Sequence, residues 1–391
     1  MNKVAYLAST LLHLQLPILK NTVFFQSFHG QYNDNPKYIS EALHRRRPDI
    51  KIVWAIKDGQ PKTFPEYAEL VHIDSLAYTK YISRAQVVVD NYLGCRSSFL
   101  KENNILKRAI YRLRARHRIG QLCISTWHGS PLKHIAMDEP QYKKAPFSAV
   151  YSNTDVLLAN DQPTANAFRT AFQWNKSFFT VGAPRNDLLF SNENTKKILK
   201  DKLGLSLDKR YVLFAPTFRN NVQMSGLYQL QQLDIRSLCS ALSEALGGQW
   251  EFIFRSHNEV MKAIGQSKQI DESQIINGNR FEDMAEYLLC ADALITDYSG
   301  CMLDYAITKK PCFLYTPDID NYGSVERGFY EDISDLPFPQ TADAKTLIEK
   351  IRNFDAASYE NAITEMLEKR GVVDCGSAAQ QVVDEIEKHL G

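Results

Sequence analysis

The segment from Ala285 to Tyr305 (AEYLLCADALITDYSGCMLDY) constrains the fold more than any other part of the sequence. Residues 285–290 have helical composition, Ala293–Thr296 form an apolar run of buried-strand length, and helical spacing resumes after residue 300. The segment therefore predicts a strand, a tight turn and a new helix. Main-chain N–H groups at such a helix start favour an anion such as phosphate. An ordinary connection capped by a Ser or Asp side chain explains the pattern equally well.

Short apolar runs alternate with helical patterns along the chain, which predicts mostly parallel sheets. The first series of expected strands comprises Val23–Phe25, Ile52–Ile56, Ala85–Asp90, Leu122–Thr126, Val156–Ala159 and Phe178–Val181. The second series comprises Tyr211–Ala215, Glu251–Phe254, Ile275–Ile276, Ala293–Thr296 and Cys312–Tyr315. A polar stretch near residues 190–208 separates them, and 391 residues exceed the usual size of one domain. We therefore expect an α/β protein with two doubly wound, Rossmann-like domains, residues 1–190 and 191–391.

Charge and cysteine content exclude several classes of protein. The net charge of +1 argues against a nucleic-acid-binding protein. The seven cysteines lack CxxC or paired Cys/His spacing, which predicts reduced thiols, no zinc site and a cytosolic location.

The apolar N-terminus from Val4 to Phe28 is interrupted by His13, Pro17 and Lys20, so it lacks the run of about 18 apolar residues that would suggest a membrane span. It also lacks a signal-peptide cleavage pattern. We expect a protein that is soluble or lies on a membrane surface.

Residues 101–118 (KENNILKRAIYRLRARHR) form the most basic stretch of the chain. Seven Lys or Arg residues accompany one acid, Glu102, and apolar residues recur at helical spacing. A basic amphipathic helix of this kind suits an anionic membrane surface. A solvated surface helix that packs on its domain has the same pattern. We favour membrane contact.

Polar side chains recur directly after expected strands. His128, Arg219 and His257 each follow the end of a strand within a few residues, as does the Ser299 turn. Open α/β sheets bind their ligands at the carboxyl ends of the strands. A histidine placed there can act as a general base near neutral pH, and an arginine can hold a phosphate with two hydrogen bonds. Each residue alone is typical of an ordinary surface position, so the hypothesis of an active site depends on their common placement.

The ordered motifs of the chain resemble one known family. The motifs are SFHGQYNDNPKYI, WHGSPLK, GAPRND, APTFR, FRSH, LITDYSGCMLDYA and RGFYED. Together they resemble the CDP-glycerol glycerophosphotransferase family, whose members build the poly(glycerol phosphate) of teichoic acids and some capsules. The resemblance extends from about Phe25 to Ile386. The chain has Ser299-Gly300 where the family usually has a Ser-Ser pair, so one hydroxyl is missing from the turn.

This resemblance implies a GT-B fold with a cleft between its two domains. It implies a CDP-glycerol donor held mainly by the C-terminal domain, with the acceptor on the side of the N-terminal domain. It also implies peripheral membrane attachment through the N-terminal half, at the inner face of the cell membrane. No metal and no cofactor are expected, in keeping with the lack of a DxD-type acidic pair.

Roles for single residues follow from the resemblance and from the charges of the reaction. We expect His128 to be the general base for the acceptor hydroxyl, and His257 and Arg219 to neutralise the diphosphate and the departing CMP. The turn at Ser299 and Gly300 would hold the diphosphate. Asp304 would bind a glycerol or ribose hydroxyl, or is a carboxylate on a helix surface. We also expect four further residues to contribute to the donor site: Thr217, Thr296, Asp297 and Arg185.

Alternatives remain open at this stage. CDP-ribitol fits the same motifs as CDP-glycerol, and a GT-B glycosyltransferase that uses a nucleotide sugar shares the fold and the phosphate-binding turn. Primase and polymerase activity, teichoic acid and capsule, and the oligomeric state are not distinguished by the sequence. A non-catalytic assembly protein with the same fold is a third possibility. The presence of His128, Arg219 and His257 argues against it, and we favour transfer of glycerol phosphate to a hydroxyl of a lipid-linked or oligosaccharide acceptor.

Overall fold

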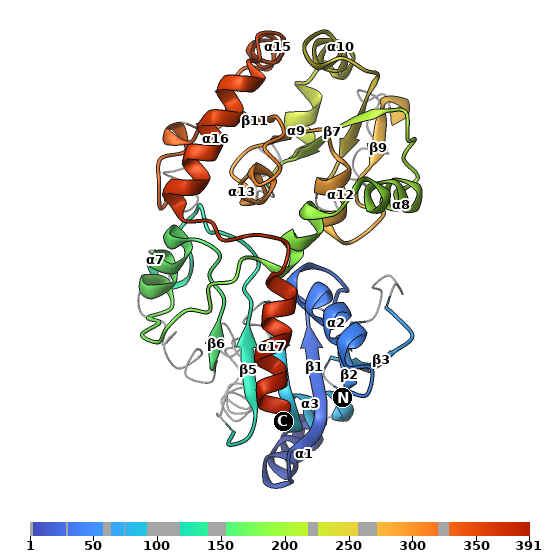
Figure 1. The fold of residues 1–391 in the computed structure, drawn as a ribbon, viewed down its shortest axis with the longest axis vertical. Coiled ribbons are helices and arrows are strands. Elements are labelled where there is room, and N and C mark those ends of the chain that lie inside the picture. The colour runs from blue at the N-terminus through green and yellow to red at the C-terminus, as the bar shows by residue number, and fades with distance from the viewer. Residues whose placement is uncertain are drawn as a thin grey trace. The chain divides into compact units, whose positions relative to one another are not determined.

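The chain forms two compact units in the computed structural model (Figure 1). The first unit comprises Met1–Ser130, Ile135–Asp187 and Val373–Gly391, and the second comprises Pro131–His134 and Leu188–Val372. The structure describes residues 3–28, 30–57, 64–73, 75–91, 118–139, 154–217, 226–256, 272–319 and 328–391. Each unit contains a six-stranded sheet in which every described pair of neighbouring strands is parallel. The expected α/β class with two doubly wound domains is confirmed.

The sheet of the first unit has the strand order β3-β2-β1-β4-β5-β6. Its strands are β1 (Leu19–Gln26), β2 (Lys51–Ile56), β3 (Ala68–His72), β4 (Ala85–Asp90), β5 (Leu122–Ser125) and β6 (Val156–Leu157). The buried parts of the inner strands are mainly apolar because helices cover both faces of a parallel sheet. The strand order reverses between β1 and β4, and this switch point is where open α/β sheets bind ligands.

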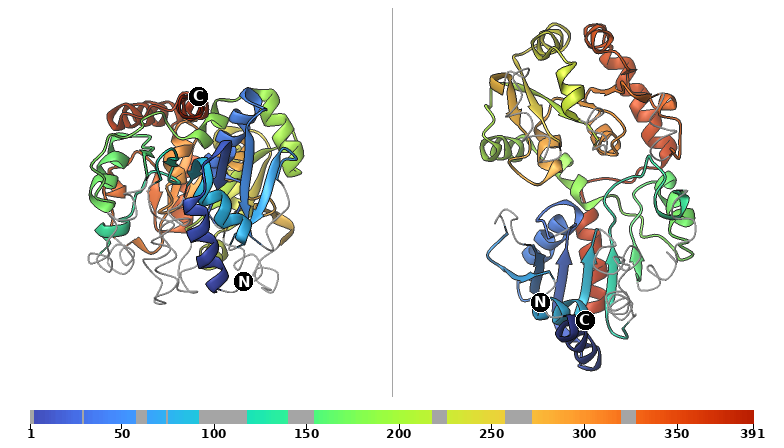
Figure 2. Two further views of the ribbon diagram at one scale, coloured as in Figure 1. Left: turned by 90° about the horizontal axis from the view of Figure 1, so that it is seen from below. Right: turned by 180° about the vertical axis from the view of Figure 1, so that it is seen from behind.

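The helices of the first unit include one from the far end of the chain. They are α1 (Lys3–Gln15), α2 (Asp34–Arg46), α3 (Leu76–Arg84), α7 (Gln162–Ala171) and α17 (Ala378–Leu390), with 3₁₀ turns at Ala136–Asp138 and Pro184–Phe190. Helix α17 packs on α2 and β4, and the right-hand view of Figure 2 shows it beside the first sheet. Arg46 pairs with Asp384 and with Glu387 (2.8 Å) across the α2–α17 contact.

The sheet of the second unit has the strand order β12-β11-β10-β7-β8-β9. Its strands are β7 (Arg210–Ala215), β8 (Trp250–Phe254), β9 (Ile275–Asn277), β10 (Ala293–Thr296), β11 (Cys312–Tyr315) and β12 (Gln340–Thr341). Its helices are α8 (Glu193–Leu203), α9 (Gly226–Gln231), α10 (Ile235–Leu246), α12 (Met284–Cys290), α13 (Cys301–Ala306), α15 (Ala344–Arg352) and α16 (Ala356–Arg370). One buried apolar cluster lies between the sheet and α12, α13 and α16, and a second lies between the sheet and α10 and α15. The switch point of this sheet lies between β7 and β10.

The structure differs from the expectations in three places. Phe178–Val181 is not a strand, because only a single bridge joins Phe179 to Leu158. Strands β3 and β12 were not expected; they are short edge strands with exposed or half-buried residues. The expected boundary near residue 190 lies close to the division after Asp187, but Val373–Gly391 groups with the first unit instead of the second. The amphipathic pattern of α17 predicts a helix and does not indicate which sheet it covers.

The regions of interest for membrane contact are only partly described. None of the helices among the described residues is long and apolar enough to cross a membrane. The basic stretch 101–118 lies outside the described residues except for Arg118. The Arg118 guanidinium donates to the main-chain oxygens of His13 and Ser83, both at 2.7 Å, and so ties the end of α1 to the end of α3.

Candidate functional site

His128 lies at the carboxyl edge of the first sheet, just after β5. Its Nδ1 lies 2.8 Å from the main-chain oxygen of Asn91, which follows β4. A carbonyl oxygen only accepts hydrogen bonds, so Nδ1 donates and carries the proton of the neutral ring. Nε2 is then the basic nitrogen. The ring stacks on Trp127 (centroids 4.1 Å apart) and lies 5.3 Å from the ring of Phe28.

The surroundings of His128 keep its ring neutral. Burial lowers its pKa below the ordinary value of 6.5, and the positive charge of Arg185 lowers it further. The hydrogen bond to Asn91 and the negative charge of Asp34 act in the opposite direction but do not outweigh burial. A neutral imidazole with a basic Nε2 is the state that a general base requires.

The side chain of Asn91 joins three segments near His128. Its amide donates to Oγ of Ser27 and to Oδ2 of Asp34, both at 3.0 Å. Its side-chain oxygen accepts from the main-chain N–H of Phe28 at 2.8 Å. All polar positions of this amide therefore have partners, and the main-chain oxygen that orients His128 is held in place.

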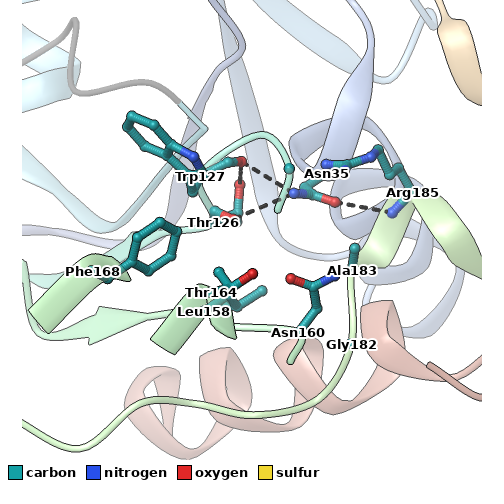
Figure 3. A pocket seen from close by; sticks show the side chains of 11 residues that line it. Asn35, Thr126, Trp127, Leu158, Asn160, Thr164, Phe168, Gly182, Ala183 and Arg185 are labelled. Atoms are coloured by element: carbon teal, nitrogen blue, oxygen red, sulfur yellow. Dashed lines mark hydrogen bonds between the residues drawn. The ribbon is translucent and has the colours of Figure 1, made fainter. Parts of the chain in front are cut away.

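Arg185 forms a buried ion pair beside this network. Its Nη1 lies 3.0 Å from Oδ1 of Asp34, and the two side chains are only 8% and 10% exposed. Asn35 links the same region to the loop that carries His128 (Figure 3): its amide donates to the main-chain oxygens of Thr126 (3.4 Å) and Trp127 (3.1 Å), and its oxygen accepts from the Arg185 N–H (3.1 Å). These bonds fix Arg185 within the first unit, on the same side as His128.

A small pocket lies next to this loop (Figure 3). Its volume is about 10 Å³, which is room for about one water molecule. Trp127, Asn160, Thr164 and Arg185 are among its lining residues. The pocket is too small for a substrate.

Three residues around His128 have strained backbones. Phe28, Asp34 and Trp127 have φ values of 42°, 57° and 51°, in the left-handed region that costs a non-glycine residue about 1 kcal/mol. Such strain persists only where surrounding contacts enforce it, and it is concentrated at functional sites. The hydrogen bonds of Asn91 and Asn35 supply this enforcement.

In the second unit, Asp297 joins the ends of β7 and β10. It is fully buried, and its Oδ1 accepts from the main-chain N–H of Thr217 (2.8 Å), from Oγ1 of Thr217 (2.6 Å) and from the N–H of Tyr298 (2.6 Å). Its Oδ2 accepts from Nε2 of Gln229 at 3.4 Å. Both oxygens of the carboxylate thus accept hydrogen bonds from protein groups. The carboxylate shapes the turn and does not face solvent.

The turn at Ser299 and Gly300 is the part of this edge that is partly exposed. Oγ of Ser299 accepts from the Cys301 N–H at 3.4 Å, and Gly300 is the residue before helix α13. Thr296 is fully buried, and its hydroxyl donates to the main-chain oxygen of Ala215 at 2.7 Å. Thr296 therefore supports the sheet edge, while the turn after it is open to a ligand.

The structure describes one of the three remaining expected site residues, Asp304, and does not describe Arg219 or His257. Asp304 lies in α13 and is buried, so it is not a carboxylate on the helix surface. Arg219 and His257 lie outside the described residues, directly after strands β7 and β8. Arg255, which precedes His257 in the FRSH motif, is half-buried: its guanidinium donates to three main-chain oxygens, and among these bonds are those to Phe281 (2.7 Å) and Glu282 (2.6 Å). Arg255 thus holds the segment after β9 against the end of β8.

Four residues of these networks were not singled out from the sequence: Asp34, Asn35, Asn91 and Gln229. Asp34 and Asn35 belong to the SFHGQYNDNPKYI motif, which was recognised without a role for either residue. Asn91 directly follows the expected strand Ala85–Asp90, so the rule that selected His128 also applies to it. Gln229 carried no signal of this kind.

Residues 8–388 match the family described as CDP-Glycerol:Poly(glycerophosphate) glycerophosphotransferase. Among curated relatives, the teichoic acid poly(glycerol phosphate) polymerase of Staphylococcus epidermidis is 31% identical over 94% of this chain and 51% of its own length. The teichoic acid glycerol-phosphate transferase of Staphylococcus aureus is 28% identical over 94% of this chain and 93% of its own length. The chain thus spans about half the length of the first relative and nearly all of the second.

Solved structures of the wall teichoic acid polymerase TagF resemble the whole chain. One of them aligns with a TM-score of 0.81 and 29% identity over 98% of this chain and 94% of its own. Another, from a crystal soaked with CDPG, aligns with a TM-score of 0.78 and 27% identity over 98% and 93% of the two chains. With the family match over residues 8–388, these likenesses show that the chain belongs to the CDP-glycerol:poly(glycerophosphate) glycerophosphotransferase family.

Proposed function

We propose that this protein transfers glycerol phosphate from CDP-glycerol to a hydroxyl group of a lipid-linked or oligosaccharide acceptor, and releases CMP. The observation that carries the proposal is the geometry of His128, whose Nδ1 donates to Asn91 and whose ring is kept neutral by burial. Membership of the family supplies the donor class.

In the proposed reaction Nε2 of His128 removes the proton of the acceptor hydroxyl. The hydroxyl oxygen attacks the phosphorus that carries the glycerol, and a new P–O bond forms. The bond from this phosphorus to the bridging oxygen breaks, and CMP leaves with both electrons of that bond. The proton passes from His128 to solvent, which restores the neutral base.

The second unit is proposed to hold the donor. The open turn at Ser299 and Gly300 would contact the diphosphate, and Asp297 would act indirectly, because its carboxylate positions Thr217 and Tyr298. Buried Thr296 would support the same edge.

Three charged residues complete the proposed site. Arg219 and His257 would neutralise charge on the diphosphate and on the departing CMP. Asp304 remains our candidate for a hydroxyl of the donor. Arg185 was expected in the donor site; its ion pair with Asp34 supports a positioning role beside His128 in the first unit.

The setting of the reaction is also a proposal. We place the protein in the cytoplasm, at the inner face of the cell membrane, where residues 101–118 would contact anionic lipids. The product would be a teichoic-acid-like or capsular polymer. The likeness to the teichoic acid glycerol-phosphate transferase of Staphylococcus aureus, over 94% of this chain and 93% of its own length, supports transfer of glycerol phosphate.

The experiment offers the purified protein CDP-glycerol, CDP-ribitol or a nucleotide sugar, together with a glycerol-phosphate-primed lipid acceptor, and measures CMP release and product length. We expect CMP from CDP-glycerol and its loss, by a factor of about 10² or more, in His128→Ala. His72→Ala, an exposed histidine of β3, serves as the matched control and should retain activity. Release of a nucleoside diphosphate from a sugar donor, or normal turnover by a folded His128→Ala protein, would overturn the proposal.

A further inference from the structure

A second, larger pocket lies in the second unit at the carboxyl ends of β11 and β12. Its volume is about 350 Å³, near the lower end of the range for small-molecule sites. Its lining residues come from α9 and the residue after it, from the end of β11 and the segment that follows, and from the segment between β12 and α15 with the first residue of α15: Tyr228, Gln229, Gln232, Tyr315, Pro317, Asp318, Ala342, Asp343 and Ala344.

Two hydrogen bonds connect this pocket with the donor turn. Gln229 lines the pocket and donates to Asp297, the carboxylate that shapes the turn. Asp318 also lines the pocket, and its Oδ1 accepts from the hydroxyl of Tyr298 at 3.0 Å. Residues Asp297 and Tyr298 immediately precede Ser299, so the wall of the pocket is hydrogen-bonded to the two residues before the turn.

The described lining of this pocket is acidic and suits hydroxyl groups. Asp318 and Asp343 contribute carboxylates, and no Lys, Arg or His is among the lining residues that the structure describes. Carboxylates repel phosphate and accept hydrogen bonds from hydroxyls. Tyr228 and Tyr315 add phenol groups, and burial with the charge of Asp343 raises the pKa of Tyr315 to about 12, so its phenol stays protonated.

The amide of Gln229 adds a further acceptor. Its Oε1 is buried and has no hydrogen-bond partner among the described residues. A buried acceptor without a partner destabilises the protein, and a donor that reaches it recovers part of this cost. Hydroxyl groups of a ligand are donors of the required size.

We propose that this pocket is a subsite for a neutral, hydroxyl-bearing part of the nucleotide donor, either its polyol or its ribose. The inference rests on the proposed function, since it assumes that the diphosphate of CDP-glycerol occupies the neighbouring turn. The inference adds a location at which the polyol or the ribose of the donor is recognised. It also identifies Gln232 and Tyr228 as residues that influence which donor is bound.

The experiment fills the pocket and compares donor fragments. Gln232 is exposed, so Gln232→Trp adds a large ring at the pocket wall, and Gln231→Trp places the same ring on an exposed neighbour that does not line the pocket. Calorimetry measures the Kd of each protein for CDP-glycerol, CDP-ribitol, CDP and CMP. We expect Gln232→Trp to weaken CDP-glycerol by about tenfold or more, and Gln231→Trp to leave it unchanged.

The fragments identify the part of the donor that is bound. If CDP and CMP keep their affinity in Gln232→Trp, the pocket holds the polyol; if all ligands weaken equally, it holds the ribose. Tyr228→Phe, which removes only a hydroxyl, gives the second test and should weaken the same ligands by a few-fold. Unchanged CDP-glycerol affinity in both variants would overturn the subsite. Failure of the wild-type protein to bind CDP-glycerol at all would instead contradict the proposed function.

Discussion

The main-chain oxygen of Asn91 lies 2.8 Å from Nδ1 of His128, and this contact fixes which ring nitrogen is basic. The pKa of the same histidine is lowered below the ordinary value of 6.5, chiefly because the surrounding protein partly shields its ring from water. Both features would keep the imidazole neutral, with Nε2 as the nitrogen that accepts the proton of the acceptor hydroxyl. The reverse tautomer would place the proton on the nitrogen that must accept one.

The pH dependence of turnover tests this state of His128. A general base is active when neutral, so activity falls as pH decreases through its pKa; since that pKa is lowered, the midpoint of the acidic limb should lie below pH 6.5. The measurement is kcat/KM for CDP-glycerol from about pH 5 to about pH 8. His128→Gln should lose this limb together with most of its activity. A midpoint at or above 6.5 in the wild-type protein would contradict the assignment.

The Arg185–Asp34 pair provides a second test, of stability and of pH dependence together. Arg185→Met leaves the Asp34 carboxylate buried without its main charge partner, which should destabilise the first unit by about 3–5 kcal/mol. It also removes a positive charge that lowers the pKa of His128, so the acidic limb of any residual activity should move to higher pH.

Two further variants control for this effect. The double variant Arg185→Met, Asp34→Asn removes both charges and should recover much of the lost stability. Arg47→Met breaks the exposed pair with Asp49 and should change stability little. Denaturant unfolding measures all three proteins. Equal stability of Arg185→Met and Arg47→Met would show that the buried pair is not important for the fold.

Much of the fold could be predicted from the sequence because buried parallel strands are continuous apolar runs. Ile52–Ile56 and Ala293–Thr296 were recognised on this basis, and both lie inside their sheets. Edge strands β3 and β12 lack this signal, since one of their sides faces solvent. The return of α17 to the first unit depends on contacts with α2 that no local pattern encodes.

The candidate site could likewise be predicted only in part. His128 and the Ser299 turn were recognised because both directly follow strands, and the carboxyl ends of parallel strands face ligands. The partners of His128 could not be derived, because Asp34 is 57 residues from Asn91 and 151 from Arg185 in the chain. Sequence patterns indicate which residues share an edge of a sheet, whereas hydrogen bonds between distant loops emerge only in the folded protein.

Asp297 offers a test of the turn in the second unit. Asp297→Ala leaves the Thr217 N–H, the Thr217 hydroxyl and the Tyr298 N–H without their acceptor, and each unsatisfied buried group costs about 1–3 kcal/mol. In Asp297→Asn the side-chain oxygen can still accept these bonds, and rotation of the Gln229 amide turns its Oε1 toward the new NH₂ group. We therefore expect Asp297→Asn to be clearly more stable than Asp297→Ala.

Thermal unfolding and the Kd for CDP-glycerol would be measured for both Asp297 variants. Asp208→Asn, at an exposed carboxylate of the same unit, is the control and should match the wild-type protein. If Asp297→Ala melted at the wild-type temperature, the carboxylate would not be what joins the two strand ends.

The last prediction concerns how α17 is attached to the first unit. The Asp187 carboxylate accepts from the N–H groups of Ala378 (2.9 Å) and Ala379 (2.7 Å), which belong to the first turn of α17 and have no partner within the helix. Asp187→Ala should therefore cost about 1 kcal/mol and speed hydrogen exchange of the α17 amides. Asp234→Ala removes a corresponding cap from α10 in the second unit and should leave α17 exchange unchanged.

Asp187→Asn tests how much the cap depends on its second hydrogen bond. Oδ1 of Asp187 accepts from Ala378 and Oδ2 accepts from Ala379, whereas an asparagine has one acceptor oxygen and an NH₂ group that only donates. Burial raises the pKa of Asp187 above that of the unfolded chain, so the contribution of this group to stability falls as pH rises through that pKa, and an asparagine does not titrate. We therefore expect Asp187→Asn to lie between the wild-type protein and Asp187→Ala in stability at pH 7, and its deficit to grow as the pH is lowered. Wild-type stability of Asp187→Asn at pH 7 would show that the second hydrogen bond does not hold the helix.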